Sequence, residues 1–250
     1  MKMKPNKGVQ GTRHKVPGPL TPDVVHKRIY MPWKLQDQQI FVHRPTLTDI
    51  PELELPAGYI EQPNSDALLN SWVGLLNAVF GGYTIDQVRP QLDSPLWNPD
   101  RVKLVSKDDK LVALSMAWHE PELWPQSGFV FWVAVSEPHH GRGLGSFVLS
   151  RALQHMAQDG LSDAVTYTKE SMLPAVKMYL KCGFRPLVTG TAPDERARWE
   201  RTFQRLGKPE LMSTVRDDYV LIARDKIRNS EIGQQSVPAY VAQGAPSAEP

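Results

Sequence analysis

The chain has 250 residues, of which 41% are hydrophobic, so it can bury one substantial core and the composition predicts one domain of ordinary size. Its 29 basic and 27 acidic residues give a formal charge of +2, which excludes a polyelectrolyte and gives no reason to expect a nucleic-acid partner. The single cysteine, Cys182, excludes an intramolecular disulfide and a cysteine-rich zinc site, as in proteins of a reducing compartment.

The two ends of the chain have little to bury. Residues 1–20 carry basic side chains among Pro, Gly and Asn, and residues 229–250 are rich in Gln, Ala, Ser and Pro, so we predict a disordered basic tail and a disordered C-terminal tail. The N-terminus lacks the apolar run of a signal peptide, and the longest apolar run, 129–135, is too short to span a bilayer. We therefore expect a cytoplasmic protein that has no membrane partner.

The segment after the basic tail has weak strand patterns. Residues 27–30 and 39–43 resemble two short strands, and 45–56 resembles a connection, so we assign 21–56 to an N-terminal extension. Residues 59–62 are expected to be the first strand of the main domain, which we place at 57–228.

An amphipathic helix follows. Apolar residues recur at helical spacing from Leu68 to Phe80, after the capping candidates Asn64 and Ser65 and before two glycines. A shorter helix is predicted from Thr84 through Val88, and it is expected to end before the proline at position 90.

The middle of the chain predicts three strands and a helix. Residues 101–106 and 110–118 form a hairpin pattern around 107–109, and residues 128–135 are apolar on both alternating faces, which indicates a strand in the middle of a sheet. A glycine-rich turn at 140–146 leads into a helix with apolar positions from Leu144 to Met156, which Gly160 ends.

The remaining elements alternate between strand and helix. We predict a strand at 164–168, a helix at 171–181 with Ser171 as its cap, and a strand at 184–188. A charged helix at 191–206 has Trp199 and Phe203 on one side, and 219–223 is predicted to be the final strand. Alternating helices and strands indicate an α/β fold with helices flanking a sheet.

The glycine-rich turn is the strongest functional pattern. Glycines at positions 141, 143 and 145 allow several backbone N–H groups to point into one concavity at a helix N-terminus, which is an anion cradle. A tight strand-to-helix connection would by itself explain one or two of these glycines. The P-loop pattern is absent, and Ser146 occupies the position of the third glycine of the dinucleotide fingerprint.

Two motifs in this region resemble the GCN5-related N-acetyltransferases (GNAT family). Residues 140–145, His-Gly-Arg-Gly-Leu-Gly, are similar to the acyl-CoA motif, with His140 where Arg or Gln is usual. Ala175, Tyr179 and Gly183-Phe184 match a second family signature, in which Met172 replaces the usual Asn. The resemblance extends over 59–223, is strongest over 128–184, and implies a central, mostly antiparallel mixed sheet and acetyl-CoA as co-substrate.

The resemblance also implies roles for individual residues. Pantetheine would pair with the backbone of the strand that ends at Val135, and a main-chain N–H there would polarise the thioester carbonyl. Tyr179 would be the general acid for the leaving thiolate, although it could instead be a packed helix tyrosine. The expected cofactor-binding residues are Val133, Val135, His140, Gly141, Arg142, Gly143, Leu144, Gly145 and Ser146.

The general base and the acceptor pocket have no motif. The candidates for the base are Glu120, His119 and Glu137, because these residues follow predicted strands directly. Glu120 is our first candidate. Cys182 is expected to be a small buried residue rather than a nucleophile. The candidate tryptophans for the acceptor pocket are Trp97, Trp118 and Trp124, and the helix at 191–206 is expected to shape the acceptor side.

These patterns predict an enzyme that transfers an acetyl group from acetyl-CoA to an amine of a small molecule or a protein, with no metal. One alternative is a non-catalytic acyl-CoA-binding or regulatory module that keeps the cradle but has no working base. A second alternative is a phosphate-binding protein unrelated to CoA. Nothing in the sequence indicates the acceptor, the preferred acyl length or the oligomeric state.

Overall fold

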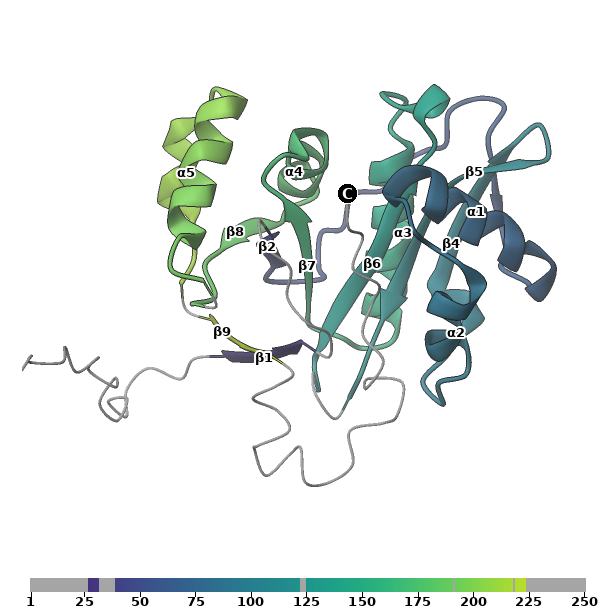
Figure 1. Cartoon of the computed structure of the whole chain (residues 1–250), viewed down its shortest axis with the longest axis horizontal. Helices are drawn as coiled ribbons and strands as arrows, with labels where there is room; N and C mark the ends of the chain where they lie inside the picture. Colours follow the sequence, from purple (N-terminus) through teal and green to yellow (C-terminus); the bar gives the residue numbers. More distant parts are fainter. Residues whose placement is uncertain (1–26, 32–38, 122–124, 191, 218, 224–250) are drawn as a thin grey trace, which may run out of the picture.

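A computed structural model describes residues 27–31, 39–121, 125–190, 192–217 and 219–223. The predicted tails and Trp124 lie outside these residues. Seven strands form the main sheet in the order β3-β4-β5-β6-β7-β2-β8, with helices packed on it (Figure 1). The strands of this sheet are β2 (Gln39–Arg44), β3 (Ile60–Gln62), β4 (Val102–Lys107), β5 (Lys110–Trp118), β6 (Ser127–Val135), β7 (Asp163–Lys169) and β8 (Arg185–Leu187).

The strand β6 is central, as its apolar faces predict. It pairs antiparallel with β5 on one side and parallel with β7 on the other, and this is the parallel pair of the seven-stranded sheet. The predicted hairpin is also present, because Lys107 pairs with Lys110 across Asp108 and Asp109, whose φ angles are 50° and 60°. Positive φ at both turn residues matches the twist of the two strands. The mostly antiparallel mixed sheet is confirmed.

The position of β2 corrects the division of the chain. We assigned residues 39–43 to an N-terminal extension, yet β2 lies inside the main sheet between β7 and β8, with all six residues buried. Its polar residues Gln39, His43 and Arg44 hid this burial, because polar side chains usually indicate an exposed strand. Nε2 of His43 lies 3.5 Å from Oδ2 of Asp163 at the start of β7. The sheet therefore includes a strand from outside the predicted 57–228 domain.

A separate two-stranded sheet joins β1 (Lys27–Met31) and β9 (Tyr219–Ala223). The two strands are parallel, with Lys27 opposite Tyr219, and Figure 1 shows them below the main sheet. The final predicted strand is therefore present, but its hydrogen-bond partner is β1.

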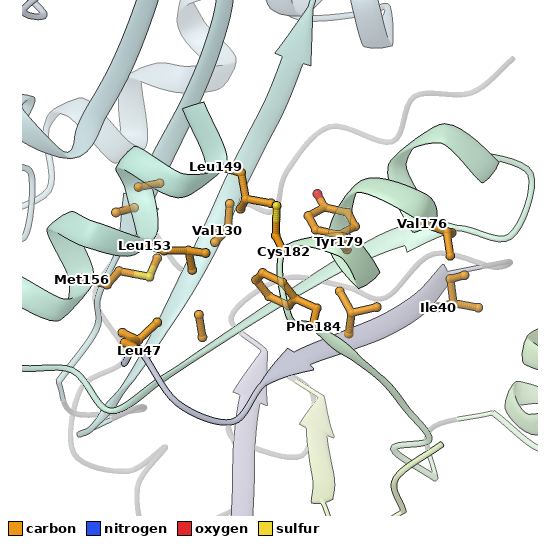
Figure 2. Packing of buried hydrophobic residues seen from close by; sticks show 14 of the residues in the cluster. Ile40, Leu47, Val130, Leu149, Leu153, Met156, Val176, Tyr179, Cys182 and Phe184 are labelled. Atoms are coloured by element: carbon orange, nitrogen blue, oxygen red, sulfur yellow. The ribbon is translucent and has the colours of Figure 1, made fainter. Parts of the chain in front are cut away.

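Helices pack on both faces of the main sheet. On one face, α1 (Leu69–Phe80) and α2 (Ile85–Leu92) bury Trp72, Leu76 and Val88 against β4, β5 and β6. On the other face lie α3 (Leu144–Gln158), α4 (Leu173–Lys181) and α5 (Glu195–Leu206). Figure 2 shows this second cluster, where Leu149 and Leu153 of α3 face Val130 of β6. The helix α5 thus packs beside α4 and β2, and Trp199 and Phe203, which share one side of it, are fully buried.

Some predicted helix ends differ from the structure. A 3₁₀ turn (Asp66–Leu68) precedes α1, and the side chain of Ser65 makes no capping hydrogen bond. The helix α2 continues through its proline to Leu92. A proline removes one backbone donor from a helix. The turn that follows is still hydrogen-bonded, since Asp93 N donates to Arg89 O at 2.8 Å. The helix α4 begins after Met172, so Ser171 is not its cap. No helix among the described residues is long and apolar enough to cross a bilayer.

Candidate active site

The strands β6 and β7 separate partway along their length. They pair from Ser127 to Phe129 with the first three residues of β7, and the pairing ends there. In the next part of β6 a bulge shifts its register against β5, and Trp132 has a φ of 50°, which is rare for a bulky residue. The bulge turns β6 away from regular pairing and leaves an opening between the two parallel strands.

Two adjoining cavities occupy this opening. The outer cavity has a volume of about 710 Å³ and runs along the glycine-rich turn. The inner cavity has a volume of about 250 Å³ and lies between the middle of β6 and the second half of β7. Both are lined by five apolar residues from α1, β6 and the start of α4, namely Val79, Phe80, Val133, Met172 and Ala175. A single ligand can therefore extend from one cavity into the other.

The glycine-rich turn has the backbone conformation that an anion cradle requires. Gly141 and Gly143 have φ angles of 74° and 83°, and Gly143 is the N-cap of α3. The first intrahelical bond runs from Phe147 N to Gly143 O at 3.0 Å, so the preceding amides of the first turn need other partners. A Cβ added to Gly145 would lie only 3.0 Å from Met178 Sδ, so α3 and α4 approach each other closely at this glycine.

Almost all the predicted cofactor-binding residues meet here. The outer cavity is lined by Val133, Val135, His140, Gly141, Gly143, Leu144, Gly145 and Ser146. Arg142 is exposed and does not line the cavity. These groups suit a phosphate-bearing acyl-CoA, because the backbone amides are donors and glycine lets a pyrophosphate approach them. In the part of the chain that the structure describes, no cluster of His, Cys, Asp and Glu could hold a metal ion.

His140, which departs from the family pattern, contacts the protein backbone. Its Nε2 donates a hydrogen bond to Val135 O at 2.8 Å, since a carbonyl can only accept. The side chain therefore links the turn to the end of β6. The neighbouring His139 contacts a side chain instead, since its Nδ1 lies 2.9 Å from the hydroxyl oxygen of Tyr59.

Tyr179 lines the inner cavity. It is 5% exposed, and burial raises the pKa of its phenol to about 12, although a hydrogen bond with Thr166 acts in the opposite direction. Thr166 in turn donates from Oγ1 to Val130 O at 2.9 Å, across the opening between β7 and β6. The phenol is thus protonated at neutral pH and held at the site where the strands separate.

The second sequence motif is also a helix stop. Phe184 N bonds to Tyr179 O at 3.0 Å, and Gly183 N bonds to Leu180 O at 3.1 Å, with a φ of 81° at Gly183. This pair of bonds is a Schellman motif, whose usual apolar contact is made by the rings of Tyr179 and Phe184 at 5.4 Å. The spacing of Tyr, Gly and Phe therefore has a structural explanation, and the tyrosine has a packing role alongside its position in the cavity (Figure 2).

Cys182 is the C-cap residue of this helix stop and contacts the cradle. The thiol is buried, as expected, and burial raises its pKa against the opposing effect of a hydrogen bond with Ser146. Ser146 belongs to the first turn of α3, so this contact joins the end of α4 to the start of α3.

Glu120 and His119 lie elsewhere. They follow β5, and the pairing of Trp118 with Phe129 places that end of β5 beside the first part of β6, whereas the cradle follows the last part. Glu120 is 2% exposed, and neither residue lines these two cavities. Of the three candidate bases, Glu137 alone lines the outer cavity.

The acceptor side differs from the tryptophan prediction. Trp118 is a buried residue of the core and Trp97 packs against the same cluster. The inner cavity is lined instead by Tyr83, Trp132 and Tyr167, and Trp132 donates from Nε1 to the Tyr83 hydroxyl at 3.1 Å. Burial raises the pKa of both tyrosines. The helix α5 contributes no residue to either cavity.

Comparison with known proteins agrees with this geometry. The family model described as Acetyltransferase (GNAT) family matches residues 72–184, so this part of the chain is similar to the GNAT acetyltransferases. A solved structure of a GCN5-related N-acetyltransferase from Sphaerobacter thermophilus aligns with a TM-score of 0.51 and 18% identity, over 59% of this chain and 48% of that chain, which indicates a shared fold.

Curated relatives are mycothiol acetyltransferases. The protein from Corynebacterium aurimucosum is 27% identical over 65% of this chain and 58% of its own length. The protein from Salinispora tropica is 28% identical over 66% of this chain and 55% of its own length. The chain thus spans little more than half the length of these relatives.

Proposed function

We propose that this protein is an N-acetyltransferase that transfers the acetyl group of acetyl-CoA to a primary amine. The observation that carries the proposal is the continuity of the glycine cradle with the opening between β6 and β7, which leads to the Tyr179 phenol. A phosphate cradle alone would fit many ligands. An opening that extends from it along β6, beyond the point where β6 stops pairing with β7, suits a long acyl carrier.

The outer cavity would hold the cofactor through the backbone. The first-turn amides of α3 would bind the pyrophosphate, and each charge-assisted hydrogen bond contributes roughly 1.5–3 kcal/mol. The helix terminus adds about 0.3–1 kcal/mol, so the amides would supply most of the affinity. Val133 and Val135 would offer backbone groups to the pantetheine arm where β6 has left β7.

The chemistry would occur at the inner cavity. The amine nitrogen forms a bond with the acetyl carbon, the carbon–sulfur bond breaks, and the departing sulfur takes a proton from Tyr179. A phenol with a pKa near 12 is fully protonated at neutral pH and is therefore available as an acid. The amine releases its own proton to solvent.

A small-molecule acceptor fits the site better than a protein segment. The inner cavity measures about 250 Å³ and has an aromatic lining, and the curated relatives are named for mycothiol. We propose that the acceptor is a small-molecule amine and that the enzyme works in the cytoplasm, where its single thiol would stay reduced.

Calorimetry with CoA and acetyl-CoA tests the cradle. Gly143→Val places a β-branched residue at a φ of 83° and should abolish measurable binding, because the turn can no longer hold its amides in place. Gly207→Val is the matched control, since Gly207 has a φ of 68° at the far end of α5 and its substitution should leave binding unchanged. Equal binding by wild type and Gly143→Val would contradict the cradle.

Thiol release from acetyl-CoA across a panel of primary amines tests the transfer. Turnover with at least one amine is the expected result. Binding of acetyl-CoA without thiol release on any amine would favour a non-catalytic acyl-CoA module, and no affinity for CoA would favour an unrelated phosphate ligand.

A further inference from the structure

Arg44 completes the helix stop that carries Tyr179. It is the last residue of β2 and is 5% exposed. Its Nη1 donates to the carbonyl oxygen of Cys182, the C-cap of α4, and its Nη2 donates to the carbonyl oxygens of Thr48 and Asp49 at 3.0 Å each. One guanidinium therefore joins a buried helix terminus to the chain segment that follows β2.

The same guanidinium packs against the glycine of the helix stop. A Cβ added to Gly183 would overlap Nη1 of Arg44, and the φ of 81° there already disfavours any other residue. Gly183 thus serves two purposes, since it permits the left-handed turn and leaves room for the arginine. The contact is specific to arginine, because a lysine ammonium is a single point and cannot reach carbonyls on both sides.

The helix stop is where Tyr179 is oriented. Its carbonyl accepts the hydrogen bond from Phe184 N, and its ring packs on the ring of Phe184. Arg44 donates to the buried carbonyl of Cys182 in the same turn, so movement of the guanidinium would loosen the turn that fixes the tyrosine. Arg44 lies outside the region that matches the GNAT family model, whereas Tyr179 and Gly183 lie within it.

We propose that Arg44 is a positioning residue for Tyr179, acting from β2 through the C-terminus of α4. This inference rests on the proposed function, in which Tyr179 is the general acid. It assigns to the N-terminal strand a part in catalysis, although no residue of β2 lines either cavity.

A double-mutant cycle tests the coupling. Arg44→Met should lower kcat for thiol release from acetyl-CoA by about tenfold or more, because small displacements of a catalytic group have large effects on rate. The dissociation constant of acetyl-CoA should stay within about twofold, since the cradle is untouched. In the Tyr179→Phe background the same substitution should cause no further fall in kcat.

Matched variants separate positioning from general destabilisation. Arg196→Met removes an exposed arginine of α5 whose partner is Asp217, and it should leave kcat unchanged. Arg44→Lys should lie between wild type and Arg44→Met. Gly183→Ala disturbs the same contact from the opposite side and should reproduce the Arg44→Met phenotype, which keeps the test available if Arg44→Met does not fold.

A spectroscopic titration provides a readout that does not need turnover. The ultraviolet difference between wild type and Tyr179→Phe reports ionisation of this phenol, and its midpoint should fall toward the ordinary tyrosine value in Arg44→Lys and Gly183→Ala. An unchanged midpoint, or an equal loss of kcat in both backgrounds of the cycle, would overturn the positioning role. Absence of turnover in wild type with every amine would instead overturn the proposed function, and the titration would still decide the role of Arg44.

Discussion

At the scale of single residues, Tyr179 combines two roles that are usually considered separately. Its backbone and ring belong to a helix stop, and its hydroxyl lies in the cavity beside Thr166. Removing only the hydroxyl separates the roles, because phenylalanine keeps the ring contact with Phe184.

Tyr179→Phe should therefore lower kcat by at least tenfold, the lower end of what a positioned general acid contributes. The dissociation constant of acetyl-CoA should change little, because the cradle is built from α3 and the end of β6. Steady-state kinetics together with calorimetry measure the two effects. Turnover equal to wild type would leave the tyrosine with its packing role alone.

The raised pKa of Tyr179 also predicts a dependence of stability on pH. The folded state favours the neutral phenol. Its contribution to the free energy of unfolding is therefore fully present below pH 10 and is lost as the pH rises toward about 12. Each pKa unit corresponds to about 1.4 kcal/mol. Urea unfolding from neutral pH to pH of about 11 should show a steeper loss of stability in wild type than in Tyr179→Phe, and parallel curves would contradict this shift.

At the scale of elements, β6 and α3 pack so closely that one position of β6 has room only for a glycine. Gly128 on β6 faces Met156 of α3, and a Cβ at this position would overlap the Met156 Sδ. Met156 is 1% exposed and has little space to move. Gly74 of α1 lies on an exposed face, and a Cβ added there would have no heavy atom of a neighbouring residue within 4 Å.

The two glycines should respond oppositely to alanine. Gly128→Ala should lower the free energy of unfolding by about 1–3 kcal/mol through overpacking. Gly74→Ala should raise it by roughly 0.5–1 kcal/mol, because alanine restricts the unfolded chain and favours a helix interior. Chemical denaturation of both variants measures these changes, and a stabilised Gly128→Ala would show that Met156 can repack.

The elements that could be predicted from the sequence are those set by local patterns. The faces of β6, the hairpin at Asp108 and Asp109, and the glycine cradle each depend on neighbouring residues, and the two motifs indicated the family. The location of Glu120 was harder, because a residue at a strand end can lie at either edge of the sheet. Since β5 and β6 are antiparallel, Glu120 lies at the edge away from the cradle.

At the scale of the whole molecule, the main sheet depends on the N-terminal strand. β2 pairs with β7 through six residues and with β8 through three, so these two strands have no direct pairing with each other. Such pairing depends on partners more than a hundred residues away, which no local pattern in 39–44 encodes. The aromatic lining of the inner cavity was missed for a related reason, since it joins the segment after α1 with β6 and β7.

A chain that begins at residue 57 should therefore not fold cooperatively. It would retain both GNAT motifs but expose the edges of β7 and β8 and the core beneath Phe41. Circular dichroism melting and size-exclusion chromatography would show a broad transition and aggregation. Cooperative melting of this shorter chain would mean that β2 is dispensable.

The placement of β2 also sets the order of events during synthesis. It is the first strand of the main sheet to leave the ribosome, and its two partners, β7 and β8, are the last. The sheet cannot be completed until residue 187 has been translated, so Ile40, Phe41 and Val42 have no paired strand for most of translation. Pairing over so long a separation slows folding and leaves the nascent chain open to chaperones and to aggregation.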